Sequence, residues 1–99
     1  MQEPGLDRHD WENELQSLED EVRDDPLGAL PELDGLVARM LEETGLDEDD
    51  EARREFAAAH EVTQLAERGE AVPPGDIAAA VNGYRTVFDY VVTLGKPES

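Results

Sequence analysis

The stretch Asp76 to Leu94, DIAAAVNGYRTVFDYVVTL, decides the fold because it is the only segment apolar enough to form the spine of a core. At about 3.6 residues per turn its apolar residues fall in one arc of roughly 160°, wider than the ~100° stripe of an ordinary surface helix. The members of the arc are Ile77, Ala80, Val81, Tyr84, Val87, Phe88, Val91, Val92 and Leu94. We therefore predict a central helix over 76–94, with Asp76 as its N-cap.

The dipeptide Asn82-Gly83 supports a different interpretation of the same stretch. Asn-Gly between apolar runs is a strong hairpin signal, and residues 84–92 are rich in strand formers. Against a hairpin, the apolar positions 77, 81, 84, 88 and 91 follow helical spacing, and residues 77–81 do not alternate. The helical interpretation is favoured.

A first helix is predicted over 8–24. Its apolar residues Trp11, Leu15, Leu18 and Val22 are separated by 4, 3 and 4 positions. This spacing is typical of an a/d seam, which is a narrow apolar stripe on an otherwise charged helix.

Two prolines mark the next segment. Asp25 followed by Pro26 is typical of a helix start, but Pro31 clashes with the carbonyl of Leu27 in a continuous helix. We therefore expect either a short turn at 26–30 followed by a new helix, or a kink. The helix proper is predicted over 31–44, with Gly45 as a suitable residue after its end.

A third helix is predicted over 49–68, where acidic residues crowd the start and satisfy free backbone N–H groups. Gly69 closes it, and residues 70–75 form a loop. Small residues dominate its inner face, so a neighbouring helix can approach closely. That face consists of Ala52, Phe56, Ala59, Val62, Thr63 and Ala66.

These segments predict an all-α protein, a small antiparallel bundle of about four helices with the last one central. The 99 residues fit a single helical domain over 8–95. Residues 1–7 and 96–99 are predicted to be disordered tails.

Charge is the most unusual feature of the composition. The chain has 26 acidic and 8 basic residues, giving a net charge of −18. Such a surface opposes binding to nucleic acid and to anionic membranes, and it favours encounter with a basic partner. Three interpretations remain open: a solvated surface adapted to high salt, a surface for a basic protein, and a mimic of nucleic acid.

The chain contains no cysteine, which excludes disulfides and thiolate metal sites. Its first residues lack the basic and apolar regions of a signal peptide, and its longest apolar run is 77–81, too short to span a membrane. A soluble, cytoplasmic protein is expected.

No metal site is predicted. Asp47-x-Asp49-x-Glu51 resembles the first half of an EF-hand loop, but Ala52 and Ala58 stand where glycine and the bidentate glutamate are needed. The two histidines lack the Glu-x-x-His motif of di-iron bundles, so His60 is interpreted as a surface residue.

No catalytic or cofactor-binding residue is predicted either. Ser17 and Ser99 stand in no nucleophile motif, and the chain lacks a phosphate-binding glycine loop and a dinucleotide fingerprint. We therefore expect a protein that is not an enzyme.

Several polar residues lie on or beside the apolar faces. A buried Glu55 would need Arg85 or Arg39 as a partner, although we expect it to reach solvent. Arg85 is placed to form a salt bridge between helices. The hydroxyl groups of Tyr84 and Tyr90 need hydrogen-bond partners where they are buried.

If the narrow seam of the first helix does not fully cover the wide arc of the last, another copy of the chain or another protein must cover the leftover apolar strip. The alternative is that three neighbouring helices cover the whole arc within one bundle. We accordingly expect a non-enzymatic interaction or adaptor protein that binds a basic or helical protein partner or a second copy of itself. An acidic inhibitor of a basic protein, either a nucleic-acid mimic or antitoxin-like, is the alternative. The predicted interaction surface consists of Trp11, Leu15, Leu18, Tyr84, Val87, Tyr90 and Leu94.

Overall fold

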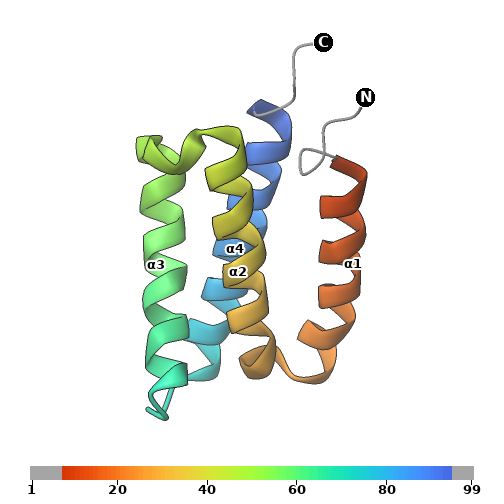
Figure 1. Cartoon of the computed structure of the whole chain (residues 1–99). Coiled ribbons are helices and arrows are strands. Elements are labelled where there is room, and N and C mark those ends of the chain that lie inside the picture. The colour runs from red at the N-terminus through yellow and green to blue at the C-terminus, as the bar shows by residue number, and fades with distance from the viewer. Residues whose placement is uncertain (1–7, 95–99) are drawn as a thin grey trace.

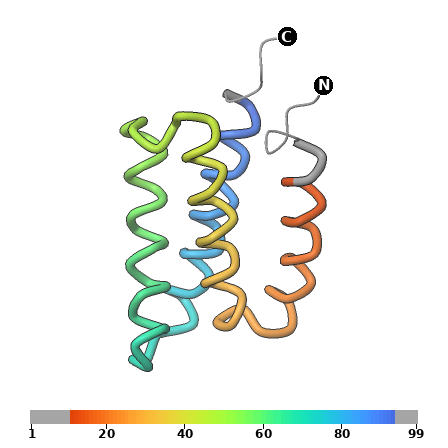
Figure 2. Tube along the Cα trace, viewed as in Figure 1, coloured from red at the N-terminus to blue at the C-terminus, as the bar shows by residue number. Residues whose placement is uncertain are grey.

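The computed structural model describes residues 8–94, and the side chains of residues 11–93. This part of the chain forms an up-and-down antiparallel bundle without strands, so the all-α prediction is confirmed (Figures 1 and 2). The elements are α1 (Arg8–Asp24), α2 (Pro26–Thr44), the 3₁₀ turn η1 (Leu46–Glu48), α3 (Asp50–Glu67) and α4 (Pro74–Leu94). The predicted tails, 1–7 and 96–99, and the predicted final domain residue, 95, lie outside the described residues.

Helix α2 begins at Pro26, so the predicted start at residue 31 is wrong. The Asp25 side chain accepts a 3.2 Å hydrogen bond from the Gly28 N–H and caps a first turn that continues without a break. Pro31 removes only the bond to the Leu27 carbonyl. Both residues are exposed, which leaves that carbonyl accessible to water.

Glycines end α2 and α3 as predicted. Gly45 and Gly69 have φ angles of 76° and 80°, a left-handed conformation that residues with a Cβ atom rarely adopt. After Gly45, η1 leads directly to Asp49, whose side chain accepts a 3.1 Å bond from the Ala52 N–H. Asp49 is therefore the N-cap of α3 instead of its first residue.

Helix α4 begins two residues earlier than predicted, at Pro74. The N–H groups of Asp76 and Ile77 donate to the Pro73 carbonyl at 3.0 and 3.1 Å. Asp76 consequently lies within the first turn, and its predicted role as N-cap is wrong. The hairpin interpretation of Asn82-Gly83 is also wrong, since both residues lie inside α4.

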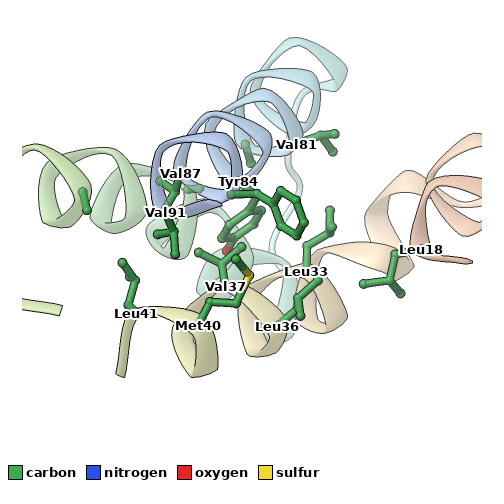
Figure 3. Close-up of a cluster of buried hydrophobic side chains, with 14 of the residues drawn as sticks. Leu18, Leu33, Leu36, Val37, Met40, Leu41, Val81, Tyr84, Val87 and Val91 are labelled. Atoms are coloured by element: carbon green, nitrogen blue, oxygen red, sulfur yellow. The ribbon is translucent and has the colours of Figure 1, made fainter. Parts of the chain in front are cut away.

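The core lies mainly between α2 and α4. Helix α4 packs against α2 and α3, whereas α2 packs against all three other helices, so the two helices share the centre of the bundle. Figure 3 shows Tyr84 and Val87 of α4 facing Val37 and Met40 of α2. The largest fully buried side chains are Tyr84, Leu30, Leu33, Leu36, Met40, Val37, Val87 and Val91.

Candidate interaction site

Four residues of the predicted interaction surface lie in the core. Trp11 and Leu18 on α1 are 7% and 6% exposed, and Tyr84 and Val87 on α4 are 0% and 1% exposed. The apolar seam of α1 packs against α2, and the middle of α4 is covered by α2 and α3. These four side chains therefore belong to the interior of the single chain.

The remaining predicted residues lie at the edges of the bundle. Leu15 and Tyr90 are half-buried and pack against the core. Leu94 is the last residue of α4, and its side chain lies outside the described part of the chain. The predicted surface is thus not one continuous patch in this fold.

A different apolar surface lies between α1 and α4. These helices make few direct contacts, because α1 packs chiefly on α2. A cavity of about 310 Å³ remains between the end of α1, the start of α2 and the first half of α4. We call it the α1–α4 groove, and its lining residues are Val22, Pro26, Pro74, Ile77, Ala78, Val81, Asn82 and Arg85.

Arg85 spans the distance from α4 to α1 beside this groove. Its Nε donates to Glu19 Oε2 at 3.0 Å and its second guanidinium nitrogen donates to Oε1 at 2.7 Å. Two parallel hydrogen bonds of this kind are the strong form of an arginine–carboxylate contact. Arg85 therefore forms the predicted salt bridge between helices. The cation that lines the α1–α4 groove is therefore already neutralised.

A second groove runs along the outer seam of α3 and α4. Two cavities of about 170 and 90 Å³ adjoin there and share Glu55. We call them together the α3–α4 groove. The residues that line it are Glu51, Ala52, Glu55, Ala58, Ala59, Val62, Asp76, Ala79, Ala80, Gly83, Thr86, Val87 and Tyr90.

The close approach predicted for the small residues of α3 occurs at Gly83. A Cβ atom added to Gly83 would lie 3.4 Å from the Ala59 Cβ and 3.7 Å from the Glu55 carbonyl oxygen. The two backbones are thus near contact at the floor of the α3–α4 groove. The Glu55 side chain is exposed to solvent, as expected.

The suggested partners of Glu55 are engaged elsewhere. One guanidinium nitrogen of Arg39 lies 3.1 Å from both carboxylate oxygens of Glu14 on α1, and Arg85 pairs with Glu19. These contacts are half-exposed and join α1 to its two neighbours. Neither arginine is therefore paired with Glu55.

A polar cluster that was not predicted from the sequence is centred on Asp34. Its Oδ2 accepts a 2.7 Å hydrogen bond from the Tyr84 hydroxyl and lies 2.6 Å from His60 Nδ1. The Thr63 hydroxyl oxygen lies 2.6 Å from the Tyr84 hydroxyl oxygen and 3.1 Å from the Ala59 carbonyl oxygen. Since the Tyr84 proton goes to Asp34, the single proton of Thr63 is shared between the Tyr84 oxygen and the Ala59 carbonyl oxygen. We call these four residues the Asp34 cluster.

Aromatic stacking holds the histidine of the Asp34 cluster in place. The rings of Phe56 and His60 are stacked with centroids 5.3 Å apart, and Phe56 meets Tyr84 edge-on at 6.0 Å. Burial is the main cause that raises the pKa of Tyr84 well above its ordinary range, so its hydroxyl stays protonated and donates. His60 therefore lies on the surface of α3, with its side chain 42% exposed, but it is held by Asp34 of α2 and by Phe56 of its own helix, contacts that were not predicted.

The hydroxyl of the half-buried Tyr90 also has a partner, because it donates a 2.9 Å hydrogen bond to Asp49 Oδ2. That bond is the main cause that raises the pKa of Tyr90. The Ala52 backbone N–H, followed by Tyr90, lowers the pKa of Asp49. The N-cap of α3 is thus tied to the last turns of α4. Among the described residues, no buried side-chain polar atom lacks a partner.

Like charges meet where α1 faces α2. Repulsion from the Glu32 carboxylate is the main cause that raises the pKa of Glu21, and Asp25 adds to it. No arginine relieves Glu21 within the ion pairs that the structure describes. The acidic surface therefore carries a local electrostatic cost at this contact.

Residues 8–94 contain no group of three or more histidine, aspartate or glutamate side chains arranged to hold a metal ion. Among the same residues, no helix has the length and apolar character needed to cross a membrane. Comparison of the chain with protein-family models, with curated proteins and with solved structures finds no match.

Proposed function

We propose that this protein is a non-enzymatic interaction or adaptor module, and that its α1–α4 groove takes apolar side chains from a helix of a basic partner protein. The observation that carries the proposal is the part of α4 that α1 leaves uncovered. Ile77 is only half-buried there, and Ala78 is exposed beside it. An amphipathic helix laid into an apolar groove is a common mode of protein recognition.

The lining of the groove supports an apolar occupant. Val22, Pro26 and Ile77 supply aliphatic surface, and the volume of about 310 Å³ is at the small end of ligand pockets. Arg85 is bound to Glu19, so burying it beneath a partner does not leave an unpaired charge. Asn82 alone offers an uncharged polar group at the edge.

The net charge of −18 supports a basic partner. Opposite charge accelerates encounter, whereas two copies of this chain repel each other at long range. Self-association, our other expectation for the partner, is therefore the weaker choice. A cytoplasmic location is part of the proposal.

The alternative function, an acidic inhibitor that occupies a basic groove, is supported by the crowded carboxylates of α1 and α2. The Glu32 carboxylate is close enough to Glu21 to raise the pKa of Glu21, so negative charge is concentrated on this face. Binding of that kind depends on many carboxylates at once and little on the α1–α4 groove. It predicts steep salt dependence.

The proposal is tested with two alanines that are both helical and exposed. Ala78→Arg places a charged side chain in the α1–α4 groove, and Ala57→Arg makes the same charge change on α3, away from both grooves. The probe is a synthetic amphipathic helix of leucine, alanine and lysine, and the readouts are amide chemical shifts and the dissociation constant. Circular dichroism checks that both variants fold.

We expect shifts concentrated on Ile77, Ala78, Val81 and Asn82, and about tenfold weaker binding for Ala78→Arg, equivalent to ~1.4 kcal/mol. Ala57→Arg should weaken binding less than about twofold. Equal weakening by both variants would favour the acidic inhibitor. A doubled mass in sedimentation that Ala78→Arg abolishes would instead identify a second copy as the occupant.

A further inference from the structure

The α3–α4 groove combines an apolar floor with walls of a single charge. Ala59 and Ala80 on its floor are 3% and 2% exposed, and the charged residues that line it are all acidic: Glu51, Glu55 and Asp76. Glu55 lines both cavities and therefore stands at the middle of the groove. The α1–α4 groove differs, because its charged lining residue is a paired arginine.

The carboxylates of this groove are not used by the fold. The ion pairs within the described chain join α1 to α2, α1 to α4 and α2 to α3, or lie within one segment, and none includes Glu51, Glu55 or Asp76. Their hydrogen-bonding capacity is directed to solvent. An apolar trough that carries unpaired anions along its length is complementary to a long aliphatic side chain with a cationic end.

We propose that the α3–α4 groove binds arginine or lysine side chains of a basic protein segment, with Glu55 as the central carboxylate. The aliphatic part of such a side chain lies over Ala59 and Ala80, and its cationic end reaches Glu55. Arginine and lysine commonly cover apolar surface with their stems in this way, and a charge-assisted hydrogen bond then fixes the end.

This inference rests on the proposed basic partner and assigns its charge recognition to a second surface. Two adjoining cavities indicate two basic side chains that enter side by side. Thr86 and Tyr90 line the second cavity together with Glu51. Binding of apolar side chains in the α1–α4 groove can be measured separately from binding of cationic side chains in the α3–α4 groove, because α4 contributes a different face to each groove.

The test compares two substitutions that remove one negative charge from the exposed side of α3. Glu55→Gln changes the proposed central carboxylate, whereas Glu61→Gln changes a glutamate that lines neither groove. The probe is a helical alanine-based peptide with two arginines one turn apart. A second peptide carries citrulline at both positions, which keeps the shape of arginine and removes its charge. Binding is followed by amide chemical shifts of the full chain.

We expect saturable shifts at Ala58, Ala79 and Gly83 with the arginine peptide and none with the citrulline peptide. Glu55→Gln should weaken binding about fivefold and Glu61→Gln less than about twofold. Ala79→Arg, which fills the groove with its own cation, should abolish binding, whereas Ala78→Arg should leave it intact.

Equal weakening by the two glutamine variants, or shifts spread over the whole acidic surface, would overturn the inference. The proposed function would stand in that case as long as the leucine-containing helix still shifts Ile77, Ala78 and Val81. If the leucine-containing helix fails and the arginine peptide binds, the α3–α4 groove is the recognition surface and the assignment of the α1–α4 groove is wrong.

Discussion

The hydroxyl of Tyr84 on α4 donates a 2.7 Å hydrogen bond to Oδ2 of Asp34 on α2. The same oxygen lies 2.6 Å from His60 Nδ1 on α3, so one carboxylate joins three helices. Apolar contacts are non-directional, whereas these bonds have a required geometry. The Asp34 cluster therefore helps to fix how α4 is rotated against α2 and α3, and with it the residues that face the two grooves.

Tyr84→Phe is expected to destabilise the protein by about 1–2 kcal/mol, because Asp34 and Thr63 each lose a partner at a buried site. The aromatic ring stays in place, so no cavity forms. Urea unfolding followed by circular dichroism measures the change. The matched control is Tyr90→Phe, which also removes one hydroxyl from α4 but at a more exposed position. A larger loss for Tyr90→Phe than for Tyr84→Phe would contradict a structural role for the Asp34 cluster.

The periodicity of the chain was sufficient to predict which segments are helical. The apolar arc of 76–94 and the seam of 11–22 depend on local spacing, and both form as predicted. The helix starts at Pro31 and Asp76 were predicted wrongly because the spacing of apolar residues does not show how backbone N–H groups are capped. In α2, the Asp25 cap allows the helix to begin before the exposed Pro31. In α4, the Pro73 carbonyl accepts hydrogen bonds from the N–H groups of Asp76 and Ile77.

The site residues were harder to predict, because their neighbours are set by how helices pack. The sequence pattern of an apolar seam such as that of Trp11 and Leu18 is the same whether the seam packs against another helix of the chain or against a partner protein. Asp34 and Tyr84 are 50 positions apart, and no local pattern joins them. The available signal was indirect: a tyrosine in the middle of an apolar arc needs a polar partner, and Asp34 lies on the facing helix.

Gly35 inside α2 and Gly45 just after its end are expected to change stability in opposite directions when replaced by alanine. Gly35 lies inside the helix with open space around its Cβ position, so Gly35→Ala should stabilise the protein by about 0.5–1 kcal/mol. Gly45 has a φ angle of 76°, so Gly45→Ala should destabilise it by about 1 kcal/mol. Thermal unfolding of the two variants under one buffer condition tests both. A stabilising Gly45→Ala would show that α2 ends differently.

Salt is expected to stabilise this fold. The chain has a net charge of −18, and its described ion pairs are largely exposed, so screening relieves more repulsion than attraction. The melting temperature should therefore rise between low and moderate sodium chloride. Sodium chloride is compared with tetramethylammonium chloride to distinguish general screening from binding of a specific cation. A melting temperature that falls over this range would mean that the ion pairs dominate.

The contact between Glu21 and Glu32 gives the sharpest pH prediction. Repulsion from Glu32, followed by burial, raises the pKa of Glu21 in the folded chain. A carboxyl group with a raised folded pKa binds its proton more tightly when folded, so the repulsion destabilises the fold above that pKa and fades as pH falls below its ordinary value. Glu32→Gln should therefore raise the melting temperature at pH 7, and the gain should disappear below about pH 4.

The control for this prediction is Glu61→Gln, which removes the same charge from the exposed side of α3. It reduces the net negative charge by the same amount as Glu32→Gln but leaves the contact of α1 with α2 unchanged. Glu32→Gln should therefore give the larger gain, and moderate salt should reduce the difference between the two variants because the pair is exposed. Equal gains at pH 7 would mean that the total charge, and not this contact, sets the electrostatic cost of folding.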